Sequence, residues 1–199
     1  MLKRCERANN WIQTALASEK NRWMIGKFVT EIGQILGKSP ADVVFDLVDE
    51  EHNQVNEVDF GMSEDDIEFI MQKPYVMPGS DGEAYSLDFP GQPHPRNFGT
   101  FPKILAHYCR DRKLFTLEEA VRKMTSLPAS RIGLDDRGVL KEQMWADIVV
   151  FDLEKLQSLP TYEEPKQPCA GIDHVFVNGV LTAENGRHTG VRAGKIIRR

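Results

Sequence analysis

Two Asn-Gly pairs near the C-terminus constrain the fold of this chain more than any other feature. Asn178-Gly179 and Asn185-Gly186 each separate short runs that are rich in apolar residues. Asn-Gly suits a two-residue turn because both positions take left-handed backbone angles. Two such turns in succession predict a three-stranded antiparallel meander. With the β-rich run 146–152, they predict that residues 136–199 form a small antiparallel β unit.

Capping signals predict several helices before residue 136. Ser39-Pro40-Ala41-Asp42 combines an N-cap serine, a proline at the first helical position and a reciprocal acid. Residues 30–36 show one apolar helical face, and Gly37 follows as a C-terminal cap. Capping boxes also begin at Ser63 and Thr116. The faces that these last two helices are expected to bury consist of Ile67, Ile70 and Met71, and of Leu117, Ala120, Val121 and Met124.

Residues 55–60 and 75–77 read as strands on either side of the helix that starts after Ser63. A further helix is predicted over 100–112, while the opening segment 11–17 could be a strand or a helix fragment. The order strand, helix, strand, loop, helix is typical of a parallel α/β arrangement. We therefore expect residues 1–135 to consist of β/α units.

The loop Gly79-Ser80-Asp81-Gly82 follows the predicted strand 75–77 and is the first candidate site. Catalytic groups in parallel α/β folds stand at the C-terminal ends of strands, which is where Asp81 lies. The flanking glycines permit backbone angles closed to other residues and allow a ligand to approach. A solvated turn is the alternative interpretation of the same four residues.

Arg96 is the second candidate, within a Pro- and Gly-rich loop predicted over 83–99. Long loops inside compact domains are often functional. The planar guanidinium of Arg96 could bind a carboxylate through two hydrogen bonds, and the alternative is a solvated loop arginine. His94, two residues earlier, could act as a ligand, as an acid or base, or as neither.

Composition excludes several classes of protein. The net charge of −5 gives no electrostatic reason to expect a nucleic-acid partner. No run approaches the roughly 18 apolar residues of a membrane span, and no secretory signal is visible. Cys5, Cys109 and Cys169 lie far apart, so no disulfide framework or zinc knuckle is indicated, and a reducing cytoplasm is the expected location. The five histidines form no closely spaced pair, and no Walker, dinucleotide-binding or nucleophile-elbow motif occurs.

A resemblance runs over nearly the whole chain and is weakest before Gly26. The segments that carry it are Gly79–Gly82, His94-Pro95-Arg96-Asn97-Phe98-Gly99-Thr100-Phe101-Pro102, 117–129, Asp136-Arg137-Gly138, 146–152 and Val175-Phe176-Val177-Asn178-Gly179. Together they resemble the C-terminal part of the D-aminoacylases, the N-acyl-D-amino-acid deacylases of the amidohydrolase superfamily. The last two segments are shared more widely among amidohydrolases and identify only the superfamily.

The resemblance implies a metal-dependent (β/α)8 barrel with an accessory β-domain, and hydrolysis of the amide bond of N-acyl-D-amino acids. Asp81 matches the family's aspartate at the end of the last barrel strand, which contacts the metal-bound water, helps to deprotonate it and passes the proton to the leaving amine. Arg96 matches the arginine that binds the substrate carboxylate. Zinc is the implied metal, and Asp81 would meet it only through the bound water.

Three departures from the family pattern stand out. The spacing from Asp81 to Arg96 is longer than in the best-known deacylases, so the pocket is expected to differ in shape. Gln143 stands where a glycine is usual, which is expected to alter the turn before 146–152. A complete barrel takes roughly 250 residues. We therefore expect this chain to hold the last third of a larger enzyme, to lack the family's metal-ligating histidines and cysteine, and to be inactive alone.

Two other functions remain open. A cyclic amidase such as a dihydroorotase or hydantoinase is one, although Arg96 favours an acyclic carboxylate substrate. A non-catalytic oligomerising module that reuses the fold is the other. A few β/α units cannot close a barrel and would expose strand edges, so we also expect self-association through those edges.

Overall fold

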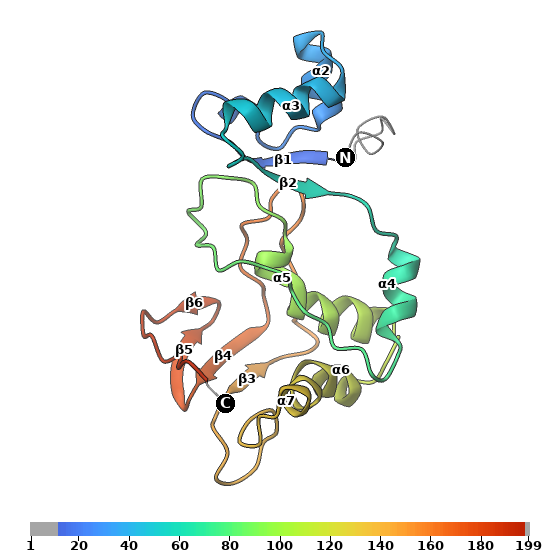
Figure 1. The fold of residues 1–199 in the computed structure, drawn as a ribbon. Coiled ribbons are helices and arrows are strands. Elements are labelled where there is room, and N and C mark those ends of the chain that lie inside the picture. The colour runs from blue at the N-terminus through green and yellow to red at the C-terminus, as the bar shows by residue number, and fades with distance from the viewer. Residues whose placement is uncertain (1–11, 198–199) are drawn as a thin grey trace. The chain divides into compact units, whose positions relative to one another are not determined.

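A computed structural model describes residues 12–197, which divide into two compact units. One unit combines residues 12–63, 82–97 and 161–167, and the other combines 64–81, 98–160 and 168–197. Figure 1 shows the elements in chain order. Cys5 and Trp11, considered above, lie outside the described residues. No helix among residues 12–197 is long and apolar enough to cross a membrane.

Two helices and a two-stranded sheet build the first unit. The elements are β1 (Ile12–Leu16), the 3-10 turn η1 (Arg22–Met24), α2 (Val29–Leu36), α3 (Pro40–Glu50) and β2 (Asn56–Asp59). β1 and β2 pair antiparallel, with Ile12 opposite Asp59. The two helices share a core with β1, in which Ile32 and Val43 are at most 1% exposed. Burying each such side chain contributes about 1.5–3 kcal/mol.

The caps predicted for α2 and α3 are confirmed. The Ser39 hydroxyl accepts a hydrogen bond from the backbone N–H of Asp42 at 3.2 Å. Pro40 is the first residue of α3, where its missing N–H costs nothing. Gly37 ends α2 with φ of +65°, in the left-handed region that favours glycine. Local sequence therefore fixes both helix boundaries.

Glu51 ties the end of α3 to the turn after β1. Its carboxylate accepts hydrogen bonds from Ser18 N at 2.8 Å, Ser18 Oγ at 2.8 Å and Asn21 Nδ2 at 2.7 Å. Glu51 and Asn21 are 8% and 3% exposed. Burial opposes the charged form of Glu51, but the hydrogen bonds from Asn21 and Ser18 outweigh it and lower the pKa of the carboxyl group. The buried charge is thus satisfied and holds the turn in place.

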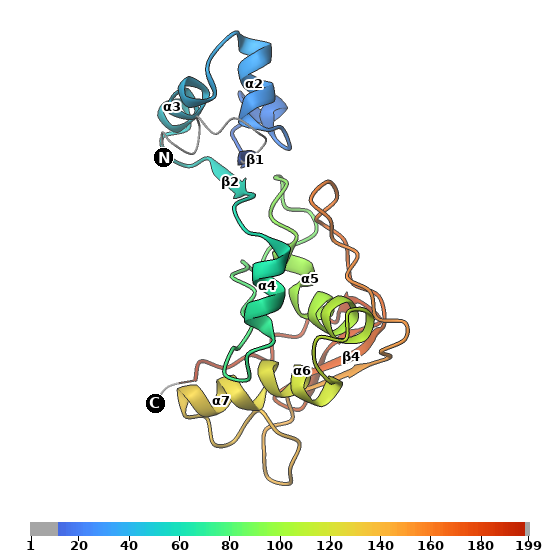
Figure 2. The same cartoon turned by 90° about the vertical axis from the view of Figure 1, so that its right-hand side faces the viewer.

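Helices dominate the first half of the second unit. They are α4 (Glu64–Met71), α5 (Arg96–Lys103), its π-helical continuation η2 (Ile104–Asp111), α6 (Leu117–Met124) and α7 (Ser126–Ile132). Only the first two residues of α5 belong to the other unit. α4 lies beside η2, and α7 follows directly on α6 (Figure 2). The core of this unit contains Leu105, Ala120 and Leu156, each at most 9% exposed.

Pro102 inside α5 has a visible consequence. A helical proline has no N–H to donate to the carbonyl four residues earlier, here that of Phe98. The Cys169 thiol donates to this oxygen instead, with Sγ and O 3.4 Å apart. Burial raises the pKa of the Cys169 thiol, which keeps it in the donating form. Cys169 is a free thiol with a structural hydrogen-bond partner.

The C-terminal sheet is antiparallel, as predicted. Its strands are β3 (Ile148–Phe151), β4 (Ile172–Val177), β5 (Val180–Glu184) and β6 (Arg187–His188), in the order β3-β4-β5-β6. At both predicted turns the asparagine and the glycine have positive φ, with 52° and 79° at Asn178-Gly179 and 48° and 76° at Asn185-Gly186. The meander is confirmed, and β3 extends it to four strands.

The parallel arrangement predicted for 55–77 is wrong within the described residues. β2 pairs antiparallel with β1, and the segment 75–77 is turn and coil rather than a strand. A parallel strand forms only beside a partner strand, and no strand of residues 12–197 pairs with this segment. The sheets of the described part are antiparallel and no barrel is closed.

Two of the predicted buried faces also differ. α4 buries none of its residues, and Ile70 is 48% exposed. In α6, Ala120 is fully buried as expected, but Val121 is 37% exposed and Lys123 is 2% exposed. Helical periodicity identifies an apolar face without saying whether a neighbour covers it.

Candidate functional site

Asp81 itself, and not a flanking glycine, takes the unusual backbone conformation in the predicted loop. Its φ is +49°, in the left-handed region that aspartate tolerates better than most residues. Gly79 and Gly82 do not have positive φ among the described residues, so the conformational reason given for them is wrong. Asp81 is exposed.

Gly82 is required by close packing. A Cβ atom added at this position would lie 3.1 Å from Cα and Oδ1 of Asn97 and 3.3 Å from the carbonyl oxygen of Arg96. At Gly79, an added Cβ would meet nothing within 4 Å. The residue after Asp81 is therefore seated against the first turn of α5, in the first unit.

Arg96 lies at the start of a helix and not in the middle of a loop. α5 begins at Arg96, whereas the sequence predicted a helical start at Thr100. The side chain is exposed. The N-terminus of a helix favours negative charge, because the helix dipole points its positive end there. Guanidinium and helix terminus therefore favour the same kind of ligand, an anion.

His94 organises this helix start. Its Nδ1 accepts a hydrogen bond from Arg96 N at 3.0 Å, which places the ring proton on Nε2. Nε2 lies 3.3 Å from the hydroxyl of Tyr162, and the two rings meet edge to face with centroids 5.1 Å apart. The carbonyl of His94 accepts from Asn97 Nδ2 at 2.9 Å. Of the roles left open for His94, the structure supports that of a positioning residue.

Asn97 connects the two ends of the long loop. Its Oδ1 accepts a hydrogen bond from Glu83 N at 2.6 Å, and its own N–H donates to the carbonyl of His94 at 3.1 Å. Sequence reasoning missed Asn97 and Tyr162. Asn97 follows Arg96 directly, but Tyr162 lies in a different part of the sequence and carries no local signal.

Asp81 and Arg96 belong to different compact units. Asp81 is the last residue of the stretch 64–81 of the second unit, and Arg96 belongs to the stretch 82–97 of the first. The chain passes from one unit to the other at the Asp81–Gly82 bond.

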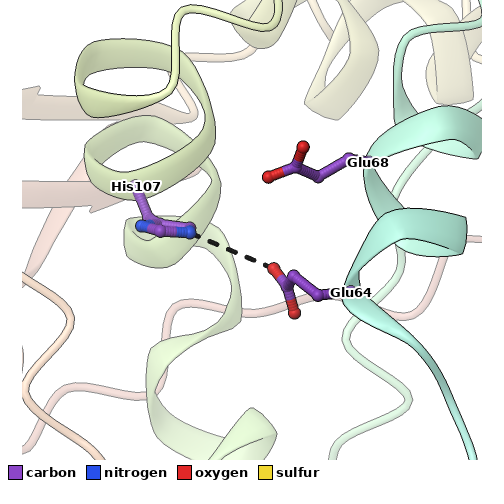
Figure 3. A group of neighbouring side chains, drawn as sticks. All are labelled: Glu64, Glu68 and His107. Carbon is purple, nitrogen blue, oxygen red and sulfur yellow. Dashed lines mark ion pairs between the residues drawn. The ribbon is translucent and has the colours of Figure 1, made fainter.

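One group of side chains has the composition of a metal site. Glu64 and Glu68 of α4 and His107 of η2 bring their ligand atoms within 4.8 Å of one another (Figure 3). Glu64 Oε1 lies 4.0 Å from His107 Nε2 and accepts a hydrogen bond from the Tyr108 hydroxyl at 2.6 Å. Asp81 is not part of this group.

Arg112 is already paired with one of these carboxylates, that of Glu68. It binds both oxygens of Glu68 at 2.8 and 2.9 Å, and this hydrogen bonding lowers the pKa of the Glu68 carboxyl group. A cation at this position would have to displace the guanidinium. The arrangement is that of an ion-pair network that holds α4 against η2.

Asp81 therefore stands without a zinc ligand set in the part of the chain that the structure describes. Zinc in proteins takes three or four convergent side-chain ligands. Among residues 12–197, histidine, cysteine or acidic side chains come close enough to share a metal ion in one place, the network on α4 and η2. The described residues do not fit a complete zinc site at Asp81.

Comparison with protein families assigns most of the chain to one known family. The model of the amidohydrolase family matches residues 44–183. The chain is 41% identical over 174 residues to a D-aminoacylase of Alcaligenes xylosoxydans xylosoxydans. The matched region makes up 87% of this chain and 34% of that protein. It is also 43% identical over 140 residues to an N-acyl-D-glutamate deacylase of the same organism. This match makes up 70% of this chain and 28% of that protein.

Solved structures show the same relationship. An N-acyl-D-glutamate deacylase of Bordetella bronchiseptica, crystallised with zinc and a phosphonate that mimics the tetrahedral intermediate, superposes with a TM-score of 0.84 at 32% identity. The match covers all of this chain and 40% of that one. The chain thus spans 28–40% of the length of these relatives.

Proposed function

This chain belongs to the amidohydrolase family, and we propose that it serves the hydrolysis of the amide bond in N-acyl-D-amino acids. The identity to a D-aminoacylase and to an N-acyl-D-glutamate deacylase supports this substrate class. Because the chain spans a part of these proteins' length, the proposal concerns an enzyme that includes this chain as one part.

The observation that carries the proposal is the placement of Arg96. An N-acyl amino acid presents a free carboxylate, and a guanidinium at a helix N-terminus is matched to it by charge and by hydrogen-bond geometry. His94, bonded to the backbone N–H of Arg96, fixes the start of α5. We assign Arg96 to binding the substrate carboxylate.

Asp81 is assigned the proton transfer. Its carboxylate accepts a proton from the water that attacks the amide carbonyl. It then delivers that proton to the amide nitrogen as the C–N bond breaks, so the amine leaves neutral and the carboxylate is regenerated. The exposed position of Asp81 at the start of a glycine-flanked loop supports this role.

We propose zinc as the cofactor of the enzyme, since the related N-acyl-D-glutamate deacylase was crystallised with it. Asp81 would meet the metal only through the bound water. The remaining ligands would come from residues other than those described between 12 and 197. Our assignments for Asp81 and Arg96 do not depend on which residues those are.

Self-association is proposed as well, and we also propose a cytoplasmic location. Several large apolar side chains of α4 and the segment after it are exposed: Phe69 by 62%, Ile70 by 48% and Tyr75 by 66%. Light scattering of the purified chain after size exclusion should give a mass above the 22.6 kDa of one copy. A monomer at all concentrations would contradict the proposal.

The catalytic assignments are tested in a chimera. This chain replaces the matched 34% of the D-aminoacylase of Alcaligenes xylosoxydans xylosoxydans, and release of free D-amino acid from N-acetyl-D-amino acids is followed. Asp81→Asn should lower kcat by about 10²–10⁴-fold, the usual effect of removing a proton-transfer group. Asp88→Asn, an exposed acid in the following loop, is the matched control.

Arg96→Gln should act on substrate binding. Loss of a charged hydrogen-bonded pair worth about 1.5–3 kcal/mol corresponds to a KM about 10–150-fold higher, with a smaller change in kcat. A folded, zinc-loaded chimera that keeps its rate with Asn at position 81 would overturn the role of Asp81. A folded chimera with zinc but without turnover would favour the non-catalytic module.

A further inference from the structure

The segment that leads from α4 to Asp81 has no regular structure. The turn after α4 is closed by hydrogen bonds from Lys73 N to Ile70 O at 3.0 Å and from Val76 N to Lys73 O at 3.1 Å. From there to Asp81 the chain is coil. Tyr75 is 66% exposed, so apolar burial does little to hold the segment. Another element supplies contacts that hold it.

A buried lysine of α6 binds this segment through its backbone. Lys123 Nζ donates to the carbonyl oxygen of Lys73 and, at 3.2 Å, to that of Val76. Of the two, only Val76 lies in the predicted strand 75–77, and in a sheet its carbonyl group would be available to a neighbouring strand. Lys123 therefore takes over one hydrogen bond that strand pairing would otherwise supply.

Arg122 adds a third contact to the same segment. Its Nη2 donates to the carbonyl oxygen of Pro74 at 2.5 Å. Glu119, one turn earlier, binds Arg122 Nε at 2.7 Å and lies 3.8 Å from Lys123 Nζ. We call the three α6 side chains Glu119, Arg122 and Lys123 the carbonyl clamp.

The burial of Lys123 indicates a dedicated role. Lysine is almost never fully buried unless it is paired, yet this side chain is 2% exposed. Burial lowers the pKa of Lys123, which is the cost of removing the ammonium from water. The Lys73 and Val76 carbonyls and Glu119 compensate that cost. An apolar residue at this position would avoid the cost but could not bind the carbonyl groups.

We propose that the carbonyl clamp positions Asp81 by fixing the segment Lys73–Val76 from which its loop starts. Val76 and Asp81 belong to the same compact unit. An extended chain of five residues spans at most about 17 Å, so a fixed Val76 confines where Asp81 can lie. Resting on the proposed function, Lys123 is a positioning residue that acts on the proton-transfer carboxylate through the backbone.

The experiment measures order along the backbone of the full chain by ¹⁵N relaxation. Lys123→Met keeps the length of the side chain and removes its three donors, and Lys141→Met is the matched exposed control. In the native chain, order parameters at Val76 and Asp81 should be near 0.85, the value of a rigid backbone. In Lys123→Met they should fall below about 0.6 while those of β4 stay unchanged.

A second variant keeps the proposal testable if Lys123→Met does not fold. Arg122→Gln alters a side chain that is 38% exposed and removes the bond to Pro74. It should lower the order parameters of Tyr75 and Val76 partially. Unchanged order in every variant that folds would overturn the clamp. A uniform loss that includes β4 would also overturn it, because that pattern indicates general destabilisation.

This measurement needs no substrate, so it separates the two proposals. The clamp would be supported and the proposed function refuted if Lys123→Met loses order at Asp81 while the chimera that carries the native chain has no deacylase activity. An active native chimera, together with unchanged order at Asp81 in Lys123→Met, would refute the clamp and support the proposed function.

Discussion

The two glycines that flank Asp81 should respond in opposite ways to alanine. Neither has positive φ, so the backbone accepts alanine at both positions. An added Cβ at Gly82 meets Cα of Asn97 at 3.1 Å and the carbonyl of Arg96 at 3.3 Å, whereas one at Gly79 meets nothing within 4 Å. Gly82→Ala and Gly79→Ala therefore form a matched pair that isolates one steric contact.

The magnitude follows from the contact distances. Carbon atoms prefer about 3.5–4.0 Å, so Gly82→Ala forces the start of α5 to move by about 0.4 Å or more. Overpacking of this kind costs about 1–3 kcal/mol. Each glycine-to-alanine change also gains about 0.4–1 kcal/mol through the unfolded chain. This gain cancels between the two variants, so Gly82→Ala should be about 1–3 kcal/mol less stable than Gly79→Ala.

Urea unfolding of the two variants measures this difference. The side-chain amide resonances of Asn97, whose Oδ1 accepts a hydrogen bond from Glu83 N, provide a local readout and should move in Gly82→Ala alone. Gly79→Ala should match or slightly exceed the native chain in stability. Equal free energies of unfolding and unmoved Asn97 side-chain resonances in both variants would refute the argument that Gly82 seats the chain against α5.

Three further predictions concern charge and backbone strain. Glu51→Gln should lower the free energy of unfolding at pH 7 by about 2 kcal/mol, because the amide keeps one of two accepting oxygens and loses the charge. The half-exposed neighbour variant Glu50→Gln should lose less. The effect of Glu51→Gln should shrink as the pH falls below 4.5, since the depressed pKa of Glu51 stabilises the fold only while the group is ionised. Gln143→Gly should stabilise the chain by about 0.5–1 kcal/mol in urea unfolding, because Gln143 has φ of +69°, and Gln54→Gly, at an exposed position without positive φ, should not. Native protein should gain stability relative to Lys123→Met as the pH rises towards 10.5, because the folded chain releases the Lys123 proton first, and parallel slopes would contradict this.

Local signals in the sequence predicted most of the regular structure. The Ser39 cap, the Gly37 terminus and both Asn-Gly turns appear where the sequence placed them. Each of these signals acts between residues a few positions apart. The residues involved therefore determine the backbone angles without help from the rest of the chain.

The strand predicted over 75–77 failed for the opposite reason. Its composition suits a strand, but a strand needs a partner, and the described part of the chain provides none there. Lys123 instead binds the carbonyl group of Val76 in this segment and that of Lys73 just before it. The helical pattern placed Lys123 in α6 without any indication that it would be buried.

The sequence alone determined which residues stand at the candidate site. Asp81 and Arg96 are recognisable from their motifs, because residue type and neighbouring glycines or prolines are local properties. Their roles in catalysis and binding remain predictions.

Only the tertiary structure decided how those residues are held. Arg96 begins a helix whose start is fixed by His94, and His94 depends on Tyr162 from a distant segment. Gly82 is needed for an approach to Asn97, not for its own backbone angles. Such contacts join residues far apart in the chain, and burial and hydrogen bonding between them depend on packing that no local pattern encodes.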